Sequence, residues 1–418
     1  MKRRKMFVSL SVVGVIATMA LAGGSASPNA RAAEAKGATI TIWDFFPAQE
    51  NAPERGALIK VANQWAKKTG NKIVHPGPIS DSIAKFKVAA PSGRGPDIIM
   101  FPHDNLGQLV APGLLAPQPS GFAINRKLYA KTGITAFTYS GKLYGLPIAT
   151  ESYFLFYNPS LVKKPPSTWT GLISQAKALT HGDQFGFLWD TTNFYYDYSF
   201  IRGFGGYVFK VTKNGYDKNR LGLTTAGGIK GLTFIQDLVQ KHKLVPATTT
   251  TNVMEGKFTN GQAAMIIDGP WAVQGFKKAG VNFKVAPLPR LSKTLPARPF
   301  IGMQGFAVNS HSKNVRAAWD LVRYLSIHFS LPLYKASGRV PVLNSVAKLK
   351  IVQRDPVTKA VIASSKTGEP MPNIPAMGVV WAPMADVLSL LVQGKVTPRE
   401  AATTAQERIA DAIKKQGG

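Results

Sequence analysis

The chain contains no cysteine among its 418 residues. This absence excludes disulfide bonds, zinc sites with cysteine ligands and thiol nucleophiles. The six histidines are scattered without a metal-ligand spacing, and the sequence has no P-loop, dinucleotide fingerprint or G-x-S-x-G elbow. Together these absences argue against a metal-dependent, nucleotide-dependent or acyl-transfer enzyme. We therefore expect no metal and no cofactor.

Acidic residues are scarce: 22 Asp and Glu stand against 51 Lys and Arg, which gives a formal net charge of +29. Lys and Arg make up roughly 12% of the chain, which is ordinary, whereas Asp and Glu make up roughly 5%, which is low. We interpret the missing carboxylates as adaptation to an acidic exterior or to an anionic cell surface, and we expect no nucleic-acid partner. Few carboxylates also predict acid tolerance, because acid destabilises proteins mainly by protonating paired carboxylates.

Residues 1–33 have the pattern of a secretory signal peptide. The basic residues Lys2 to Lys5 precede an apolar stretch from Phe7 to Ala22, and Ala30-Arg31-Ala32 provides a cleavage site. We therefore expect an exported protein that is extracellular, cell-surface-associated or periplasmic; a retained membrane anchor is the alternative. Gly24 stands where a bacterial lipoprotein signal has its cysteine, which excludes lipid attachment at that position.

No later stretch is expected to span a membrane. The best candidate, Gly378 to Val392, is short for a span and carries Asp386. The mature protein should therefore be exported and soluble.

Hydrophobic periodicity predicts an α/β fold for the mature chain. Thr39–Trp43 alternates apolar and polar residues, which predicts a strand, and Ile98–Phe101 predicts another. Glu54–Thr69 carries an apolar stripe that includes Trp65, which predicts a helix capped by Gly70. Further predicted elements are an apolar strand over 147–158 and helices over 169–179, 229–243, 314–329 and 398–415.

Residues 258–273 suggest a binding position. Ala263–Ile267 is an apolar run of strand length, and Asp268-Gly269-Pro270 then breaks it, with Pro270 suited to the first position of a helix. This geometry would lift Trp271 onto the rim at the carboxyl end of a sheet, where α/β folds bind ligands. The alternative is that Trp271 is a core residue.

Trp and Tyr residues beside isolated carboxylates indicate a sugar ligand. One face of a pyranose ring packs on an aromatic ring, and its hydroxyl groups bind charged acceptors strongly. A glycosidase needs the same mixture, because two carboxylates flank the bond that it cleaves. Composition alone leaves both binding and hydrolysis open.

Several stretches resemble the bacterial extracellular solute-binding proteins of carbohydrate ABC importers, and among them the maltose/maltodextrin-binding group. They occur in family order and span nearly the whole mature chain. The most specific are Gly261 through Trp271 and Met371-Pro372-Asn373-Ile374-Pro375. The others are Gly95–Ile99 with His103-Asp104, Asn158-Pro159 with Pro166–Trp169, Gly205–Lys210, Ala226-Gly227 with Gly231–Phe234, and Arg298–Gly302.

The resemblance implies an α/β, two-lobed periplasmic-binding-protein-like fold of type II, with a hinge and an interlobe cleft. The N-terminal lobe would comprise residues 38–149 and 306–351, and the C-terminal lobe 154–300 and 358–414. The chain would cross the hinge at 150–153, 301–305 and 352–357.

The resemblance also implies the site residues. Asp104 matches the N-lobe carboxylate that takes sugar hydroxyls, and Glu151 matches the carboxylate beside the hinge. Tyr195, Trp271 and Trp381 match stacking residues of the C-terminal lobe. Phe101 stands where the family often has Trp, Asn105 replaces an Arg and Asn193 replaces a Glu; Glu50 is placed less securely because the 44–54 loop is hard to align. These departures put the preferred sugar length or linkage in question.

The function implied is a secreted, non-catalytic binding protein that delivers maltose or malto-oligosaccharides to an ABC importer by hinge closure. Its partners would be the sugar and the membrane subunits of the importer, and the protein would be a monomer. The alternatives are another oligosaccharide, such as trehalose or a cyclodextrin, and an extracellular glycoside hydrolase.

Overall fold

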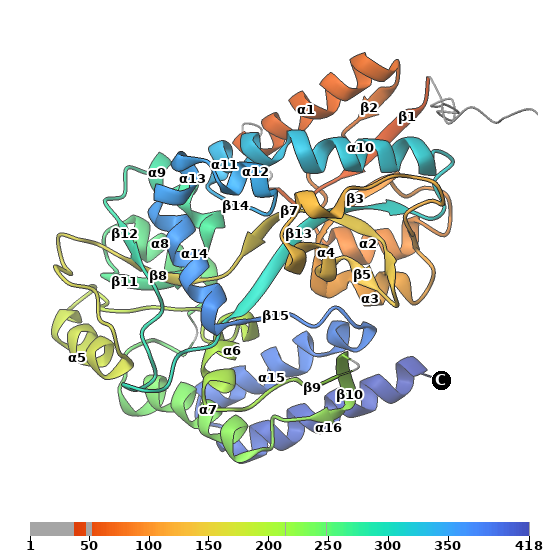
Figure 1. The fold of residues 1–418 in the computed structure, drawn as a ribbon. Helices are drawn as coiled ribbons and strands as arrows, with labels where there is room; N and C mark the ends of the chain where they lie inside the picture. Colours follow the sequence, from red (N-terminus) through yellow and green to blue (C-terminus); the bar gives the residue numbers. More distant parts are fainter. Residues whose placement is uncertain (1–36, 47–51, 214, 248, 418) are drawn as a thin grey trace, which may run out of the picture. The chain divides into compact units, whose positions relative to one another are not determined.

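The computed structural model describes residues 37–46, 52–213, 215–247 and 249–417 (Figure 1). The expected signal peptide and Glu50 lie outside these residues. The strands are β1 Thr39–Trp43, β2 Lys72–Val74, β3 Ile98–Pro102, β4 Leu115–Ala116, β5 Thr138–Tyr139, β6 Lys142–Leu143, β7 Gly145–Glu151, β8 Phe154–Tyr157, β9 Phe209–Thr212, β10 Gly215–Leu221, β11 Met265–Asp268, β12 Lys284–Ala286, β13 Phe300–Asn309, β14 Val340–Pro341 and β15 Glu369–Pro370.

The helices complete the α/β pattern. The α-helices are α1 Pro53–Thr69, α2 Ser82–Ala89, α3 Leu106–Val110, α4 Lys131–Ala136, α5 Trp169–Leu179, α6 Phe194–Gly203, α7 Ala226–Gln236, α8 Thr251–Thr259, α9 Val273–Lys278, α10 Val315–His328, α11 Ser330–Ser337, α12 Asn344–Ala347, α13 Lys350–Arg354, α14 Pro356–Thr367, α15 Trp381–Val392 and α16 Pro398–Gly417. The 3-10 helices are η1 His103–Asn105, η2 Arg126–Leu128, η4 Pro270–Ala272 and η5 Pro375–Val379, and η3 Asp237–Lys241 is a π-helical turn.

The largest sheet has the strand order β14-β7-β13-β3-β1-β2. β1 pairs in parallel with β2 and β3, whereas β13 runs antiparallel to β3 and β7. All ten residues of β13 are buried, as expected for a strand covered on both faces. Buried apolar side chains from residues 40–149 and 301–352 form one cluster around this sheet, which we call the N-terminal core.

A second, three-stranded sheet has β8 at its centre, paired antiparallel with β11 and β12. Buried apolar side chains from residues 153–300 and 357–413, together with Val340, form a separate cluster, the C-terminal core. Aromatic rings dominate it: Trp169, for example, packs edge-on against both Phe187 and Phe200.

The predictions of helices and strands from long apolar patterns are confirmed. In α1, Leu58, Val61 and Trp65 are buried, and Gly70 ends the helix in the left-handed conformation at φ 75°. The strands expected at 39–43 and 98–101 and the helices expected at 169–179, 314–329 and 398–415 are present within two residues of those bounds.

The single strand expected over 147–158 is wrong. β7 ends at Glu151 in the large sheet, and β8 begins at Phe154 in the second sheet. Ser152, between them, donates a hydrogen bond to the Phe300 carbonyl oxygen at 2.9 Å. Both strands are buried and apolar, so periodicity gives no sign of the change of sheet.

The helix expected over 229–243 begins earlier and ends differently. It starts at Ala226, capped by the side chain of Thr225, and passes at Asp237 into the π-helical turn η3. Thr225 is a standard N-cap residue. A π-helical turn has no simple sequence signature, so its position could not be predicted.

Pro375–Val392 corrects the expectation that no later stretch has the length and hydropathy of a membrane span. These 18 helical residues have a mean hydropathy of 1.6. No other helix in the described part of the chain is both long enough and apolar enough to cross a membrane. Its apolar side chains have partners in the protein: Met384, Leu388 and Leu391 are fully buried in the C-terminal core.

Gly231 tests the packing of α7 on α6. A Cβ atom at Gly231 would lie 2.5 Å from the Ile201 Cα atom, whereas one at Gly256 in α8 would have no neighbour within 4 Å. Gly231→Ala should therefore lower the free energy of unfolding by about 1–3 kcal/mol. Gly256→Ala, the matched control, should raise it by roughly 0.5–1 kcal/mol. Urea denaturation measures both, and equal effects would contradict this packing.

Candidate functional site

A cavity of about 240 Å³ collects side chains from both halves of the structure. Five residues expected at the site line it: Asp104, Glu151, Tyr195, Trp271 and Trp381. The remaining lining residues are Pro102, Gly302, Gln304 and Met371.

Trp271 reaches the cavity through the turn that follows β11. Gly269 is extended, and Pro270 is the first residue of η4. The Trp271 indole folds back over Gly269, where a Cβ atom would overlap the ring. Trp271 is partly buried, and its ring lies 6.1 Å from that of Tyr195 at an interplanar angle of 56°. Glycine at 269 is therefore what allows the indole to occupy this position.

Tyr195 and Trp381 stand on the first turns of two helices. Asn193 caps α6, since its side chain accepts a hydrogen bond from the Tyr195 amide at 3.1 Å. Trp381 begins α15 and contacts Phe194 and Phe300, with ring centroids 5.9 and 6.2 Å away. These aromatic contacts hold the two rings against the C-terminal core.

Asp104 lies in η1, directly after β3, and only 4% of its surface is exposed. Burial raises its pKa to about 7, although hydrogen bonds, including those from the Trp381 and Asn105 side chains, oppose the shift. Asn105 Nδ2 lies 3.3 Å from Asp104 Oδ1. Asp104 can therefore donate a hydrogen bond in acid and accept several when it is ionised.

His103 fixes the turn that carries Asp104. Its Nδ1 accepts a hydrogen bond from the Met303 amide at 3.1 Å, so Nε2 carries the proton and donates to the Met371 carbonyl oxygen at 3.0 Å. Burial lowers the pKa of His103 to about 4, so the ring is neutral at ordinary pH. His103 thus ties η1 to β13 and to the chain after β15.

Glu151 ends β7 with both carboxylate oxygens engaged. One forms an ion pair with Arg339, and the other accepts a hydrogen bond from Gln304 Nε2 at 2.8 Å. Arg339 is buried, which lowers its pKa to about 10, while the charge of Glu54 acts in the opposite direction. Glu151 therefore reaches the cavity as a carboxylate already balanced by a buried cation.

The other residues expected at the site lie elsewhere. Phe101 does not line the cavity: it is fully buried in the N-terminal core, 5.7 Å from the Phe137 ring, because β3 points it inward. Asn193 acts as a helix cap, and Glu50 lies outside the described residues. Asn105 borders a second hollow instead.

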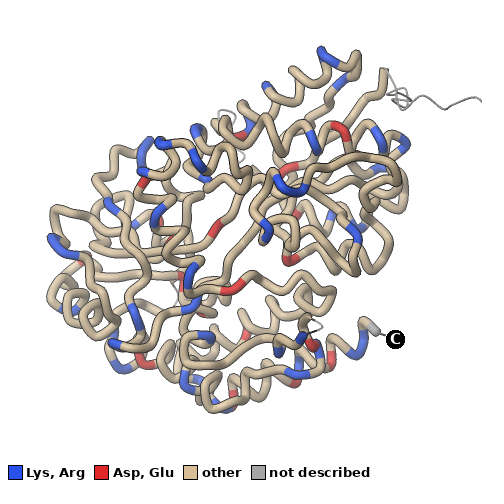
Figure 2. Tube along the Cα trace, viewed as in Figure 1, with Lys and Arg blue, Asp and Glu red and all other residues tan. Residues whose placement is uncertain are grey.

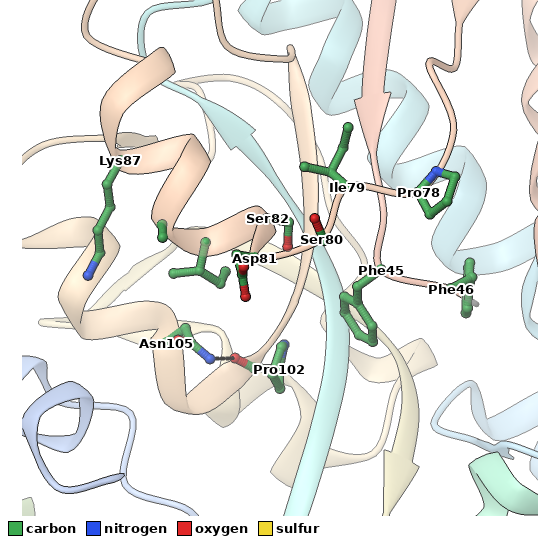
Figure 3. A pocket seen from close by; sticks show the side chains of 12 residues that line it. Phe45, Phe46, Pro78, Ile79, Ser80, Asp81, Ser82, Lys87, Pro102 and Asn105 are labelled. Carbon is green, nitrogen blue, oxygen red and sulfur yellow. Dashed lines mark hydrogen bonds between the residues drawn. The ribbon is translucent and has the colours of Figure 1, made fainter. Parts of the chain in front are cut away.

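This second hollow, of about 870 Å³, adjoins the first, since Pro102 lines both (Figure 3). Phe45 and Lys87 border it, together with Asn105, which donates a hydrogen bond to the Pro102 carbonyl oxygen at 3.2 Å. The rest of its lining is Phe46, Pro78, Ile79, Ser80, Asp81, Ser82, Ile83 and Ala84. Like the smaller cavity, it is lined by both aromatic and polar side chains.

Sequence reasoning missed Gln304, Met371 and Arg339. Gln304 lines the cavity and is one of two amide side chains, with Asn309, in the buried and otherwise apolar strand β13, which is a readable signal. Met371 begins the Met371–Pro375 segment already noted. Nothing in the sequence around Arg339 marks it as a partner of Glu151. In the part of the chain that the structure describes, no three His, Asp or Glu residues gather to hold a metal ion.

The family model for bacterial extracellular solute-binding proteins matches residues 60–360. This chain belongs to that family. The galactooligosaccharide-binding protein of Bacillus subtilis is 31% identical over 98% of both chains. The maltooligosaccharide ABC transporter solute-binding lipoprotein of Streptococcus pneumoniae is 32% identical over 86% of both.

A solved relative has the same fold. The maltose-maltodextrin binding protein of Alicyclobacillus acidocaldarius superimposes with a TM-score of 0.82 at 34% identity, covering 89% of this chain and 99% of that one. The expected fold class, the two-lobed α/β fold of this solute-binding family, is therefore confirmed.

Asp104 gives a prediction for pH dependence. Because its pKa rises from 3.8 to about 7 on folding, the folded chain holds the extra proton in this range, and stability is lost as pH rises through it. Asp104→Asn cannot ionise, so it should raise Tm by a few degrees at pH 8 and by much less at pH 4. Asp183→Asn, at an exposed position, is the control. An equal change in Tm at both pH values would contradict the assignment.

The Glu151–Arg339 pair gives a second prediction. Arg339→Met leaves Glu151 without its cation and should lower the free energy of unfolding by about 3–5 kcal/mol. The double variant Glu151→Gln/Arg339→Met should lose at least about 1 kcal/mol less than the sum of the single variants. Urea denaturation of the four proteins completes the cycle. Strictly additive losses would show that the two groups do not compensate each other.

Proposed function

We propose that this protein is an exported, non-catalytic binding protein for maltose or malto-oligosaccharides that serves an ABC importer. The observation that carries the proposal is the cavity in which Tyr195, Trp271 and Trp381 meet Asp104 and Glu151. Aromatic faces suit the apolar side of a glucose ring, and carboxylates suit its hydroxyls. The names of the Streptococcus and Alicyclobacillus relatives support the same sugar class.

Hinge closure is the mechanism that we propose. The N-terminal core is formed by residues 40–149 and 301–352. The C-terminal core is formed by residues 153–300 and 357–413. This division supports lobes that meet at 150–153, 301–305 and 352–357, although Val340 packs in the C-terminal core. A sugar that touches Asp104 on one side and Trp271 on the other would favour the closed state, since only there does it contact both lobes.

An oligosaccharide fits better than a single sugar. The small cavity adjoins the larger hollow at Pro102, and the hollow carries Phe45, Asn105 and Lys87 for further rings and hydroxyls (Figure 3). The mature protein would act as a monomer and present the closed form to the membrane subunits of the importer.

A galactooligosaccharide is the second candidate ligand, because the Bacillus relative that matches 98% of this chain carries that name. Isothermal titration with maltotriose, maltose, trehalose, a cyclodextrin and a galactooligosaccharide separates the candidates. Maltotriose should have the highest affinity of the five sugars or share it with another of them. If only the galactooligosaccharide binds, it is the ligand instead of a malto-oligosaccharide.

Hydrolysis has its own test, since a buried acid with a pKa of about 7 beside a carboxylate also suits a glycosidase. The protein incubated with maltotriose should leave the sugar intact. Shorter sugars appearing at a rate proportional to protein concentration, and lost in Asp104→Asn, would overturn the binding-only function.

Trp271 and Gly269 test the stacking position. Trp271→Ala should weaken maltotriose binding by about 1–3 kcal/mol, because a stacking contact is lost. Gly269→Ala should also weaken binding, since its methyl group displaces the indole. Gly275→Ala in α9, where a Cβ atom has open space, is the matched control and should bind normally. If Trp271→Ala retains full affinity, Trp271 does not contact the sugar.

A further inference from the structure

Residues 269–368 contain 16 Lys and Arg but only two acidic residues, Asp320 and Asp355. Both acids are occupied within the protein. Asp320 accepts a hydrogen bond from the Trp65 indole at 2.7 Å and pairs with Arg323. Asp355 caps α14 by accepting from the Thr358 amide at 2.8 Å. Among the described residues, the only cations of this segment with an acidic partner are Arg323, paired with Asp320, and Arg339, paired with Glu151 from outside the segment.

Many of these cations lie on elements that contact one another, although Lys and Arg also occur elsewhere along the chain (Figure 2). α9 contacts α11, and α14 contacts both α13 and β12. The Tyr334 hydroxyl of α11 donates to the Ile351 carbonyl oxygen of α13 at 2.9 Å. We call this surface the basic face. Its exposed cations, none of which forms an ion pair among the described residues, are Lys277, Lys278, Lys284, Lys335, Lys348, Lys350, Arg354, Lys359 and Lys366.

Aliphatic side chains project from the same surface. Leu349, Ile351 and Ile362 are 37%, 56% and 48% exposed, and they are three of the nine large apolar side chains exposed in the described part of the chain. Such residues are expected in a core unless a partner covers them, and three within 14 residues of one another form a local concentration.

The outer side of α14 combines both features. Lys359, Ile362 and Lys366 follow a spacing of three and four residues, which places them on one side of the helix. Val357 and Val361 are buried in the C-terminal core on the other side. The helix therefore presents to solvent a stripe that is both cationic and aliphatic.

We propose that the basic face docks the exported protein on an anionic lipid surface. Lys and Arg near a membrane are attracted by acidic headgroups, and protruding aliphatic side chains enter the boundary between headgroups and acyl chains. A soluble polyanion would use the cations but leave the exposed isoleucines without a role. None of these residues lines either hollow, so the docking is independent of the sugar site.

Vesicle sedimentation tests the docking. The exported form, purified from cells that express the full chain, is mixed with vesicles of phosphatidylcholine, with or without 30% phosphatidylglycerol, at low and high salt. It should bind the anionic vesicles and release them in high salt. Lys350→Glu/Lys359→Glu/Lys366→Glu should weaken this binding at least tenfold. Lys60→Glu/Lys142→Glu/Lys164→Glu, which makes the same charge change at exposed positions elsewhere, should weaken it less than threefold.

The aliphatic residues separate a membrane from a soluble polyanion. Ile351→Ser/Ile362→Ser should weaken vesicle binding at least threefold while leaving elution from a heparin column unchanged. If the two triple lysine variants lose vesicle affinity equally, the net charge of the protein, and not the basic face, is responsible for vesicle binding. If the isoleucine variant binds vesicles as well as the unchanged protein does, the isoleucines do not enter the membrane, and the partner of the basic face would be a soluble polyanion. Sugar affinity should be the same in all variants, which confirms that each is folded.

Discussion

The buried ion pair between Glu151 and Arg339 is the interaction on which the site depends. Glu151 ends β7, Arg339 directly precedes β14, and Gln304 of β13 completes the set. Three strands of the large sheet therefore meet at one carboxylate. Because a buried charge is costly without its partner, the pair fixes how these strand ends lie, and with them one wall of the cavity.

The opposite wall depends on aromatic packing instead of charge. The Trp381 ring packs against Phe194 and Phe300, and the Tyr195 ring stacks on Phe300. Trp271 rests on Gly269. A rigid aromatic wall facing a polar wall is a preorganised arrangement for a flat ligand with an apolar face and a hydroxyl rim. We therefore propose that the cavity binds a sugar and that the basic face on the outside of the molecule binds an anionic surface.

Much of the fold could be predicted from the sequence. In α1 and α10, for example, the apolar residues recur with helical spacing and so lie on one face of the helix. Periodicity could not show the break between β7 and β8, since two buried strands read as one apolar run; only the hinge crossing that the resemblance implied at 150–153 pointed to it. The resemblance brought together Asp104, Glu151, Tyr195, Trp271 and Trp381, but it misplaced Phe101, whose neighbours in β3 turn it into the core. The pairing of Glu151 with Arg339 could not be predicted, because an ion pair between distant segments leaves no local pattern in the sequence.

A crystal structure with bound maltotriose would show directly whether the cavity binds the sugar. We predict a glucose ring stacked on Trp271 or Trp381, with hydroxyl groups within hydrogen-bond distance of Asp104 and Glu151. Sugar density outside the cavity that these residues line, with the cavity itself empty, would contradict this binding mode.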